Sequence, residues 1–166
     1  MNKKVFQLLV DNTSGVLSRI SGLFSRRGYN IESITAGETA DSRYTRITIV
    51  ASGDDEILEQ IEKQVAKLVD VRAIKVLEPS NSVFYELCLV KVEVAISERE
   101  SIIAIGNLFH CKVVDVTPQS MIFEITGNSA KIESFLTMLE GHKILELART
   151  GITGLSRGYD DVIWLD

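Results

Sequence analysis

The first part of the chain alternates between strand-like and helix-like spacing of its apolar residues. Lys4 to Val10 is rich in β-branched and aromatic residues and precedes Asp11-Asn12-Thr13-Ser14-Gly15, which is dense in turn residues. This pattern predicts a strand followed by a loop. From Val16 the apolar residues recur at helical spacing as far as Gly28, which suits a left-handed helix cap. The inner face predicted for this helix consists of Val16, Leu17, Ile20, Leu23 and Phe24.

Two more strands and a second helix follow. Ile31 to Ala36 and Tyr44 to Val50 predict strands, joined by a hairpin through Asp41-Ser42. Asp54-Asp55 predicts the start of a helix, because acidic side chains complement the positive end of the helix dipole. Val71 to Leu77 predicts a closing strand, so the order is βαββαβ. The buried stripe predicted for the second helix consists of Ile57, Leu58, Ile61, Val65 and Leu68.

A boundary is predicted near the middle of the chain. Glu78-Pro79-Ser80-Asn81-Ser82 is the only stretch that combines Pro, Ser and Asn between apolar runs. Phe84 to Val94 then predicts a long strand. In Ser97-Glu98-Arg99-Glu100, the spacing of Ser97 and Glu100 predicts a capping box at the start of a helix. The remaining predictions are strands at Lys112–Val116, Met121–Thr126 and Ile144–Thr150, inner helix positions at Ile102, Ile105, Leu108, Phe109, Ile132, Phe135, Leu136 and Leu139, and a cap at Gly141.

The second half therefore repeats the element order of the first without repeating its residues. We predict an α+β fold of two tandem ferredoxin-like βαββαβ modules. The predicted domains are residues 1–78 and 84–166, joined by a linker at 79–83. The length of 166 residues is compatible with one sizeable core or with two small ones of about 80 residues each.

The amino-acid composition limits the classes of molecule that the chain is expected to bind. With 18 Lys and Arg against 23 Asp and Glu, the net charge is −5. This argues against a surface that neutralises many phosphates or lies on anionic lipid, so neither nucleic acid nor a membrane is predicted as a partner. No apolar run approaches the roughly 20 residues of a membrane span, and the N-terminus has no signal-like stretch. The predicted location is the cytoplasm, where Cys88 and Cys111 would be reduced thiols.

The residues that usually carry catalysis are sparse. His110 and His142 have no carboxylate or cysteine partner at metal-ligand or triad-like spacing. The glycines between Gly151 and Gly158 lack the strand, turn and helix of a phosphate loop. Cys88 lies in an apolar run, which should raise its thiol pKa. We predict neither a catalytic nor a metal site.

One loop has a pattern that suits a ligand. Asp11 to Gly15 leads directly into a helix whose first turn, Val16-Leu17-Ser18, contains no acidic residue. The free amides and partial positive charge of a helix start attract a carboxylate, and Gly15 would let the ligand approach the backbone closely. The plainer alternative is that Ser14 or Asp11 caps the helix while Gly15 serves the turn. Local pattern alone favours this alternative and leaves both open.

A family resemblance bears on this choice. Asp11-Asn12-Thr13-Ser14-Gly15-Val16-Leu17-Ser18-Arg19 and the run from Leu23 to Ile34 are very similar to the signature of the acetohydroxyacid (acetolactate) synthase small subunit. The first half of that family is an ACT domain, a βαββαβ module that binds amino acids. Thr35-Ala36-Gly37 departs mildly from the family's signature, because members of the family more often have valine at the position of Ala36. The likeness covers nearly the whole chain, because three further runs resemble the second domain: Val114-Asp115-Val116, Glu124-Ile125-Thr126-Gly127 and Glu146-Leu147-Ala148-Arg149-Thr150-Gly151.

The resemblance implies a non-catalytic regulatory subunit. It would bind valine, or a related branched-chain amino acid, for feedback inhibition, and it would activate the catalytic large subunit. Thiamine diphosphate, Mg and FAD would bind that subunit and not this chain. Valine would sit between the ACT domains of a homodimer. Its carboxylate would meet Asn12 and the backbone at Gly15, Val16 and Leu17 of one subunit, while Asn30 and Ile31 of the neighbour would receive its amino group and side chain.

Other classes share this element order. A ferredoxin-like enzyme of the acylphosphatase kind needs an arginine in the loop after the first strand, whereas Arg19 lies a turn inside the helix. An RNA-binding module needs exposed aromatics on its central strands, for which Tyr44 beside Arg46 is a thin match. Without the resemblance, Asn30 is more simply a turn residue after Gly28. The main alternative is a stand-alone amino-acid sensor, which would not co-purify with a large thiamine-diphosphate enzyme.

Overall fold

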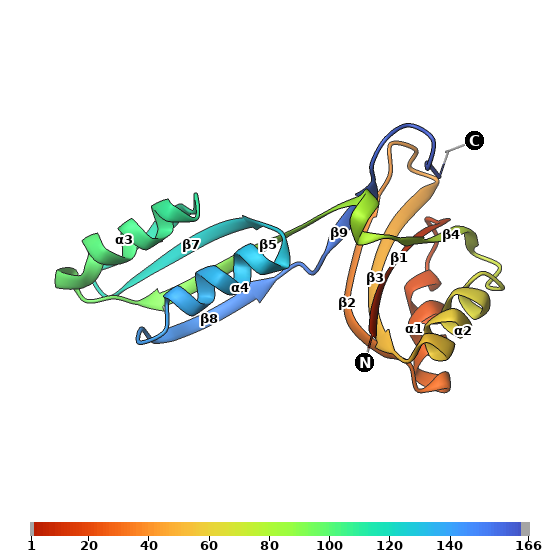
Figure 1. Cartoon of the computed structure of the whole chain (residues 1–166), viewed down its shortest axis with the longest axis horizontal. Helices are drawn as coiled ribbons and strands as arrows, with labels where there is room; N and C mark the ends of the chain where they lie inside the picture. Colours follow the sequence, from red (N-terminus) through yellow and green to blue (C-terminus); the bar gives the residue numbers. More distant parts are fainter. Residues whose placement is uncertain (1, 164–166) are drawn as a thin grey trace. The chain divides into compact units, whose positions relative to one another are not determined.

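The computed structural model describes residues 2–163 and shows two compact units (Figure 1). The first unit contains the chain up to Phe84 together with the segment from Ile152 onward, and the second contains Tyr85–Gly151.

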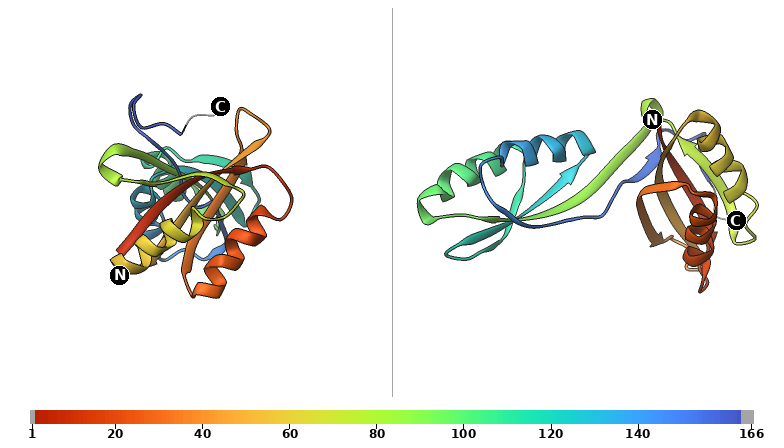
Figure 2. Two further views of the ribbon diagram at one scale, coloured as in Figure 1. Left: turned by 90° about the vertical axis from the view of Figure 1, so that its right-hand side faces the viewer. Right: turned by 90° about the horizontal axis from the view of Figure 1, so that it is seen from below.

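The first unit is a sheet covered by two helices on one face (Figure 1, Figure 2). The sheet is antiparallel, with the strand order β2-β3-β1-β4. The βαββαβ order and the hairpin near Asp41 are as the sequence predicts. The elements are β1 (Asn2–Asp11), α1 (Val16–Arg27), β2 (Asn30–Glu38), β3 (Tyr44–Gly53), α2 (Asp55–Val65) and β4 (Val71–Leu77).

Its core lies between the sheet and the helices. Phe6, Leu8 and Val10 of β1 are fully buried and alternate with residues on the other face. Gly28 ends α1 in the left-handed conformation, as predicted, with φ 66°. Leu17 is 48% exposed, so its predicted inner-face position is wrong. It lies one residue, or about 100°, around the helix from the buried Val16.

The second unit repeats this architecture, with the strand order β6-β7-β5-β8. Alternate residues of β5 and β7, including Val90 and Phe123, are buried in its core beside Ile102 and Phe135 of the helices. The ferredoxin-like prediction is therefore confirmed for both units. The elements are β5 (Ser82–Glu93), α3 (Arg99–Leu108), β6 (Lys112–Val116), β7 (Ser120–Gly127), α4 (Ser129–Met138) and β8 (Ile144–Arg149), with short 3-10 turns at Pro79–Asn81 and Ile96–Glu98.

The start of α3 differs from the predicted capping box. The chain first makes the 3-10 turn at Ile96–Glu98, and α3 begins only at Arg99. The Glu98 carboxylate accepts a hydrogen bond from the backbone N–H of Ala95 at 3.4 Å. As in the predicted capping box, a side chain contacts the amide three residues before it. The pair is Ala95 and Glu98, however, which lies two residues before the predicted pair of Ser97 and Glu100.

The last described segment packs against the first unit. β9 (Thr153–Ser156) pairs with β5, and the Gln7 side-chain amide donates to the Gly154 carbonyl at 2.7 Å. Because Gln7 alternates with Phe6 and Leu8, this contact lies on the sheet face opposite the helices. An apolar cluster covers the same face and comprises Val5, Val50, Leu77, Phe84 and Ile152.

The observed boundary of the second unit differs from that of the predicted second domain, which ran from residue 84 to 166. Residues from Ile152 onward belong to the first unit, and residues 164–166 of the predicted range lie outside the described part of the chain. The physical reason is that β1 is buried on both faces, from Val5 to Val10. Such a strand needs cover on each side, but its sequence does not show which segment supplies the second cover.

Candidate functional site

The loop after β1 leaves the start of α1 open. Gly15 is the N-cap residue, with φ 85° and ψ −7°, and no side chain caps the helix. The Asp11 carboxylate is instead bound to Arg72 at 2.6 Å. The first turn of α1 contains no acidic residue. The amides of the first turn have no partner inside a helix, so this end presents donors and partial positive charge. The capping alternative raised by the sequence is therefore excluded for Asp11 and Ser14.

A guanidinium lies over this helix start. Arg19 binds Asp70 through Nε at 2.5 Å and through Nη2 at 2.9 Å. Its remaining nitrogen, Nη1, lies only 2.8 Å from the position that a Cβ on Gly15 would occupy. The hydrogen bonds from Arg19 lower the pKa of Asp70, and the same pairing raises the pKa of Arg19. Asp70 therefore fixes the guanidinium of Arg19 beside Gly15 and balances its charge.

Arg19 is not among the site residues predicted from the sequence. The signal that could have identified it is its spacing of four residues from Gly15, which places both on one side of the helix start.

Asn12 is engaged in the loop itself. Its Nδ2 donates to the Ser42 carbonyl at 2.9 Å and to Glu38 Oε2 at 3.2 Å. Its Oδ1 accepts from Thr45 Oγ1 at 3.1 Å. These bonds tie the loop to the hairpin between β2 and β3. A ligand that uses this amide must replace one of them, so the observed role of Asn12 is to position the loop beside Glu38.

Asn30 and Ile31 lie at the other end of the sheet. Asn30 Nδ2 donates to Ser52 Oγ at 3.2 Å, and the residue lines a pocket of about 450 Å³ together with Tyr29 and Asp54. Ile31 packs against the core.

The strand register shows how far this end lies from the loop. β1 has Lys3 opposite Ser52 and Asp11 opposite Tyr44. The two ends are eight residues and therefore roughly 26 Å apart, at about 3.3 Å per residue. One chain brings Asn12, Gly15, Val16 and Leu17 together and keeps Asn30 and Ile31 away from them.

The remaining reactive groups do not form a comparable site. Burial raises the pKa of the Cys88 thiol, as the sequence predicts, and raises that of Cys111 to about 11. Thiols with raised pKa values are poor nucleophiles at neutral pH. Among residues 2–163, no cluster of three or more His, Cys, Asp or Glu side chains is arranged to hold a metal ion. None of the helices in this range is long and apolar enough to cross a membrane.

Comparison with known families gives two matches in tandem. Residues 6–73 match the model described as an AHAS small subunit-like ACT domain. Residues 85–158 match the model described as the small subunit of acetolactate synthase. The two matches cover both units in chain order.

Individual proteins are similar over nearly the whole length. A protein of Methanothermobacter thermautotrophicus named "Probable acetolactate synthase small subunit" is 50% identical over 155 residues, which are 93% of this chain and 92% of that protein. The acetolactate synthase isozyme 3 small subunit of Salmonella typhimurium is 43% identical over 157 residues, covering 94% and 96%. The crystal structure of the acetolactate synthase small subunit from Thermotoga maritima superposes with a TM-score of 0.89, at 37% identity, covering 96% of this chain and 99% of that one.

Proposed function

The chain belongs to the family of acetolactate synthase small subunits, and from this premise we propose that it binds valine, or a related branched-chain amino acid, to control the catalytic large subunit. The observation that carries this proposal is the uncapped start of α1, with Gly15 at φ 85° and Arg19 Nη1 beside it. A helix start without a side-chain cap or an acidic first turn has its donors available for a carboxylate from outside the chain.

The effector carboxylate would bind at the amides of Val16 and Leu17. Hydrogen bonds to a charged group are shorter and stronger than neutral ones, and Arg19 Nη1 would add a charge-assisted donor to those of the helix start. Arg19 is already held by Asp70 through two of its nitrogens, so little side-chain freedom remains to be lost on binding. Gly15 would leave the backbone accessible, since it has no side chain to cover these amides.

The rest of the site would come from a second copy. β2 is an edge strand of its sheet. The Thr39 N–H donates to the Tyr44 carbonyl at 3.1 Å, and backbone direction alternates along an antiparallel pair. Ile34 therefore directs its N–H and C=O outward. Pairing of two β2 strands about a two-fold axis at Ile34 would bring the Asn30 end of the second copy to the Glu38 end of the first, across the register irregularity between Ile31 and Ser33.

This pairing would bring together the two groups of site residues that lie at opposite ends of the sheet in one chain. Glu38 is hydrogen-bonded to Asn12, at the same end of the sheet as Gly15. Asn30 of the second copy would then lie beside the loop, where its carbonyl oxygen and the Glu38 carboxylate suit an ammonium group. Ile34, 39% exposed in one chain, would be covered by the pairing. We therefore propose a homodimer through the ACT domains, with effector sites that neither copy completes alone.

The effector's side chain would lie near Leu17 and Ile31 of the two copies. Leu17 is 48% exposed although it is apolar, which fits a residue that a ligand or partner covers. A small apolar surface of this kind suits a branched aliphatic side chain. Because one methylene changes binding by only roughly 1–3 kcal/mol, valine, leucine and isoleucine should all compete for this site.

Regulation would follow from linkage between the effector and the catalytic subunit. An effector that bridges two copies stabilises one arrangement of the dimer, and it can inhibit only if the catalytic subunit binds the arrangements with different affinities. We propose that thiamine diphosphate, Mg and FAD are held by the catalytic subunit and none by this chain. The proposed place of action is the cytoplasm.

A reconstitution assay tests this function. Pyruvate condensation is measured with the chain alone, the cognate catalytic subunit alone and the mixture, each with and without valine. We expect no activity from the chain alone, a higher turnover in the mixture, and inhibition by valine only in the mixture. Condensation by the chain alone would contradict the proposal, as would a mixture that behaves like the catalytic subunit alone. Failure to co-purify with a thiamine-diphosphate enzyme would favour a stand-alone sensor.

A further inference from the structure

The last described segment of the chain lies on the face of the first unit's sheet that the helices leave free. We call residues 153–163 the strap, which begins with β9 and continues in the dark blue segment after it (Figure 1). Gly154 is buried, whereas the other strap residues are exposed or only partly buried. A segment with so little buried surface is one that can open locally.

The contacts that hold the strap are mainly polar. They are those of Gln7 Nε2 with the Gly154 carbonyl at 2.7 Å, Lys75 Nζ with Ser156 Oγ and with the Asp161 carbonyl at 2.7 Å each, Arg157 N–H with the Asn81 carbonyl at 2.8 Å, and Arg46 Nη2 with the Ile163 carbonyl at 3.3 Å. The net stability from such hydrogen bonds is modest, because water takes their place when the strap leaves.

The apolar cover of the same sheet face comes from residues that precede the strap. Phe84 and Ile152 pack against the buried cluster of Val5, Val50 and Leu77. Phe84 lies in β5, and Ile152 is the residue before the strap begins. Release of the strap would therefore leave this cluster in contact with both residues, so that apolar cover of β1 stays in place.

The closed strap leaves a buried polar atom without a partner. Gln7 is completely buried, and its Oε1 has no hydrogen-bond partner among residues 2–163. A buried acceptor in this state costs free energy, which hydration would recover. The attachment of the strap therefore carries a penalty that its release removes.

Lys75 of β4 joins the sheet to two points of the strap. It lies opposite Gln7 in the strand register, and its side chain is only 16% exposed. Its Nζ also forms an ion pair with Asp161 Oδ1 at 3.3 Å. Within the described part of the chain, Ser156 and Asp161 supply all the partners of this ammonium. A charge that is largely buried needs such partners, so Lys75 and the strap depend on each other.

We infer that the strap is a releasable cover of the first unit, which leaves the sheet as one segment while the sheet stays folded, and that Lys75 holds it closed. Release would uncover the Gln7 amide and the Lys75 ammonium beside Arg46, and so present a cationic surface that the closed strap covers. This inference does not depend on the proposed effector, so the two can fail separately.

Native-state amide hydrogen exchange on the full chain tests the release. The Arg157 amide reports on the strap, because its acceptor on Asn81 lies outside it. The Leu8 amide lies in the central strand β1 and reports on the whole sheet. We expect the protection factor of Arg157 to be about 100-fold or more below that of Leu8. It should also respond less to low urea concentrations, because release exposes less surface than unfolding does.

A core substitution separates local release from unfolding. Ile61→Val changes a fully buried residue of α2, away from the strap, and should lower the protection factor of Leu8 while leaving that of Arg157 unchanged. If Arg157 instead has the protection factor and urea dependence of Leu8, and both fall together in Ile61→Val, the strap opens only when the unit unfolds and the inference is overturned.

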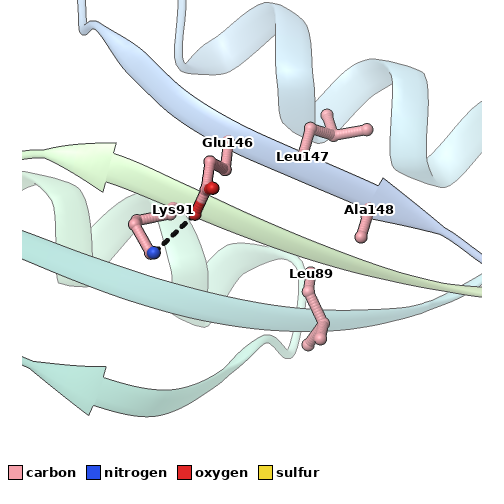
Figure 3. Close-up of a pocket in the computed structure, with 5 residues that line it drawn as sticks. All are labelled: Leu89, Lys91, Glu146, Leu147 and Ala148. Atoms are coloured by element: carbon pink, nitrogen blue, oxygen red, sulfur yellow. Dashed lines mark hydrogen bonds and ion pairs between the residues drawn. The ribbon is translucent and has the colours of Figure 1, made fainter.

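Lys75→Met tests the part assigned to the ammonium. Methionine keeps much of the apolar length and removes the charge, so the protection factor of Arg157 should fall about tenfold, as expected for the loss of a charge-assisted contact. Lys91 is the matched control. It lines a pocket on β5 and β8 of the second unit and forms an ion pair with Glu146 at 2.5 Å (Figure 3). Lys91→Met should leave Arg157 unchanged.

Added salt distinguishes an ionic hold from a packing role of the Lys75 side chain. Salt screens ion pairs that solvent reaches, and the Asp161 side chain is 57% exposed. Salt should therefore lower the protection factor of Arg157 in the wild type and have less effect in Lys75→Met. Equal effects of Lys75→Met and Lys91→Met on Arg157, or an equal response of wild type and Lys75→Met to salt, would overturn the inference that Lys75 holds the strap.

Discussion

Gly15 shapes the loop and keeps the helix start accessible, and glycine is the residue type that suits both roles. Its φ of 85° is a conformation that side chains other than glycine rarely adopt, and a Cβ would approach Arg19 Nη1 to 2.8 Å. The sequence suggested the ligand approach through Gly15 but not its dihedral angle or the position of Arg19. The position of Arg19 depends on Asp70, which is distant in sequence and orients the guanidinium. The same glycine therefore shapes the loop and keeps the helix start accessible.

Substitution of Gly15 should separate these two roles. Gly15→Ala and Gly15→Asp both place a side chain at positive φ, so each should lose about 1–2 kcal/mol of unfolding free energy. Only the aspartate adds a carboxylate beside Arg19. We expect Gly15→Asp to weaken valine binding more than tenfold, since charge-assisted hydrogen bonds contribute roughly 1.5–3 kcal/mol, while activation of the catalytic subunit remains. Valine titration measures the affinity of each variant, and circular dichroism measures its unfolding. Equal loss of binding in the two variants would assign the effect to strain.

The Arg19–Asp70 pair predicts a pH-dependent stability. The folded protein lowers the pKa of Asp70, chiefly through hydrogen bonds from Arg19. A lowered carboxyl pKa contributes stability above the unfolded value and loses it as the pH falls through the folded value. Asp70→Asn should therefore be less stable than wild type at neutral pH, and the difference should shrink below about pH 4.

The matched control for Asp70→Asn is Glu59→Gln. It breaks the exposed Glu59–Lys63 pair of α2, whose side chains are 61% and 65% exposed. Exposed pairs of this kind contribute little. Urea unfolding at several pH values measures the stability of both variants. If the stability difference between Asp70→Asn and wild type does not change with pH, the ionised Asp70 carboxylate is not its cause.

Among the elements, α1 differs from the other long helix starts. The Asp54 side chain accepts from Ile57 N–H at 2.8 Å at the start of α2, and Asn128 accepts from Lys131 N–H at 2.9 Å at the start of α4. Neither α1 nor α3 has such a contact, but the first turn of α3 contains Glu100, whereas that of α1 contains no acidic residue. Within residues 2–163, α1 is thus the α-helix with neither a side-chain cap nor an acidic first turn, which is the arrangement expected where a ligand replaces the cap.

The capped helices allow a control for this interpretation. Asn128→Ala removes the cap of α4 and should cost about 1 kcal/mol of unfolding free energy. It should leave valine binding unchanged, because α4 belongs to the second unit. Chemical denaturation and calorimetry with valine measure the two effects. Loss of valine binding in the folded variant would show that the second unit contributes to the site.

The elements were largely predictable because their apolar periods are regular. Helix face residues such as Ile20, Ile61 and Phe135 are buried where the 3.6-residue spacing places them. The sequence failed where a contact depends on tertiary structure, as at the 3-10 turn before Arg99 and in the short β9. β9 is only four residues long and contains Gly154, so its periodicity is too brief to distinguish a strand from a loop.

At the scale of the whole molecule, the segment from Ile152 joins the far end of the chain to the first unit. Gln7 is completely buried and relies on the Gly154 carbonyl for its hydrogen bond. Lys75 of β4 binds Ser156 Oγ and the Asp161 carbonyl, each at 2.7 Å. The first unit therefore includes residues that the sequence assigned to the second, and its stability should depend on them.

Gly154→Val should weaken this attachment. A Cβ at Gly154 would lie 2.6 Å from the Phe84 ring and 3.1 Å from Leu77. Overpacking of this kind costs about 1–3 kcal/mol. We expect the first unit to unfold at lower urea and the segment after Gly151 to become sensitive to protease. Leu155→Ala, at a neighbouring residue that is 58% exposed, should have little effect. A variant as stable and as resistant as wild type would show that the segment is not needed.

We propose that each effector site is built from two copies of the chain. Gly15→Asp disables the loop half, and Asn30→Ala removes the side chain from the opposite end of the sheet. Each variant alone should fail to bind valine. When the two are mixed and allowed to exchange subunits, every hybrid dimer contains one site with both halves intact.

Calorimetric titration of valine into the equilibrated mixture shows whether these hybrid sites form. Random exchange makes half of the dimers hybrid, so the mixture should recover about a quarter of the wild-type binding sites at wild-type affinity. If the mixture binds no valine although mass spectrometry shows hybrid dimers, the two halves do not meet across subunits, and the account of the site is wrong.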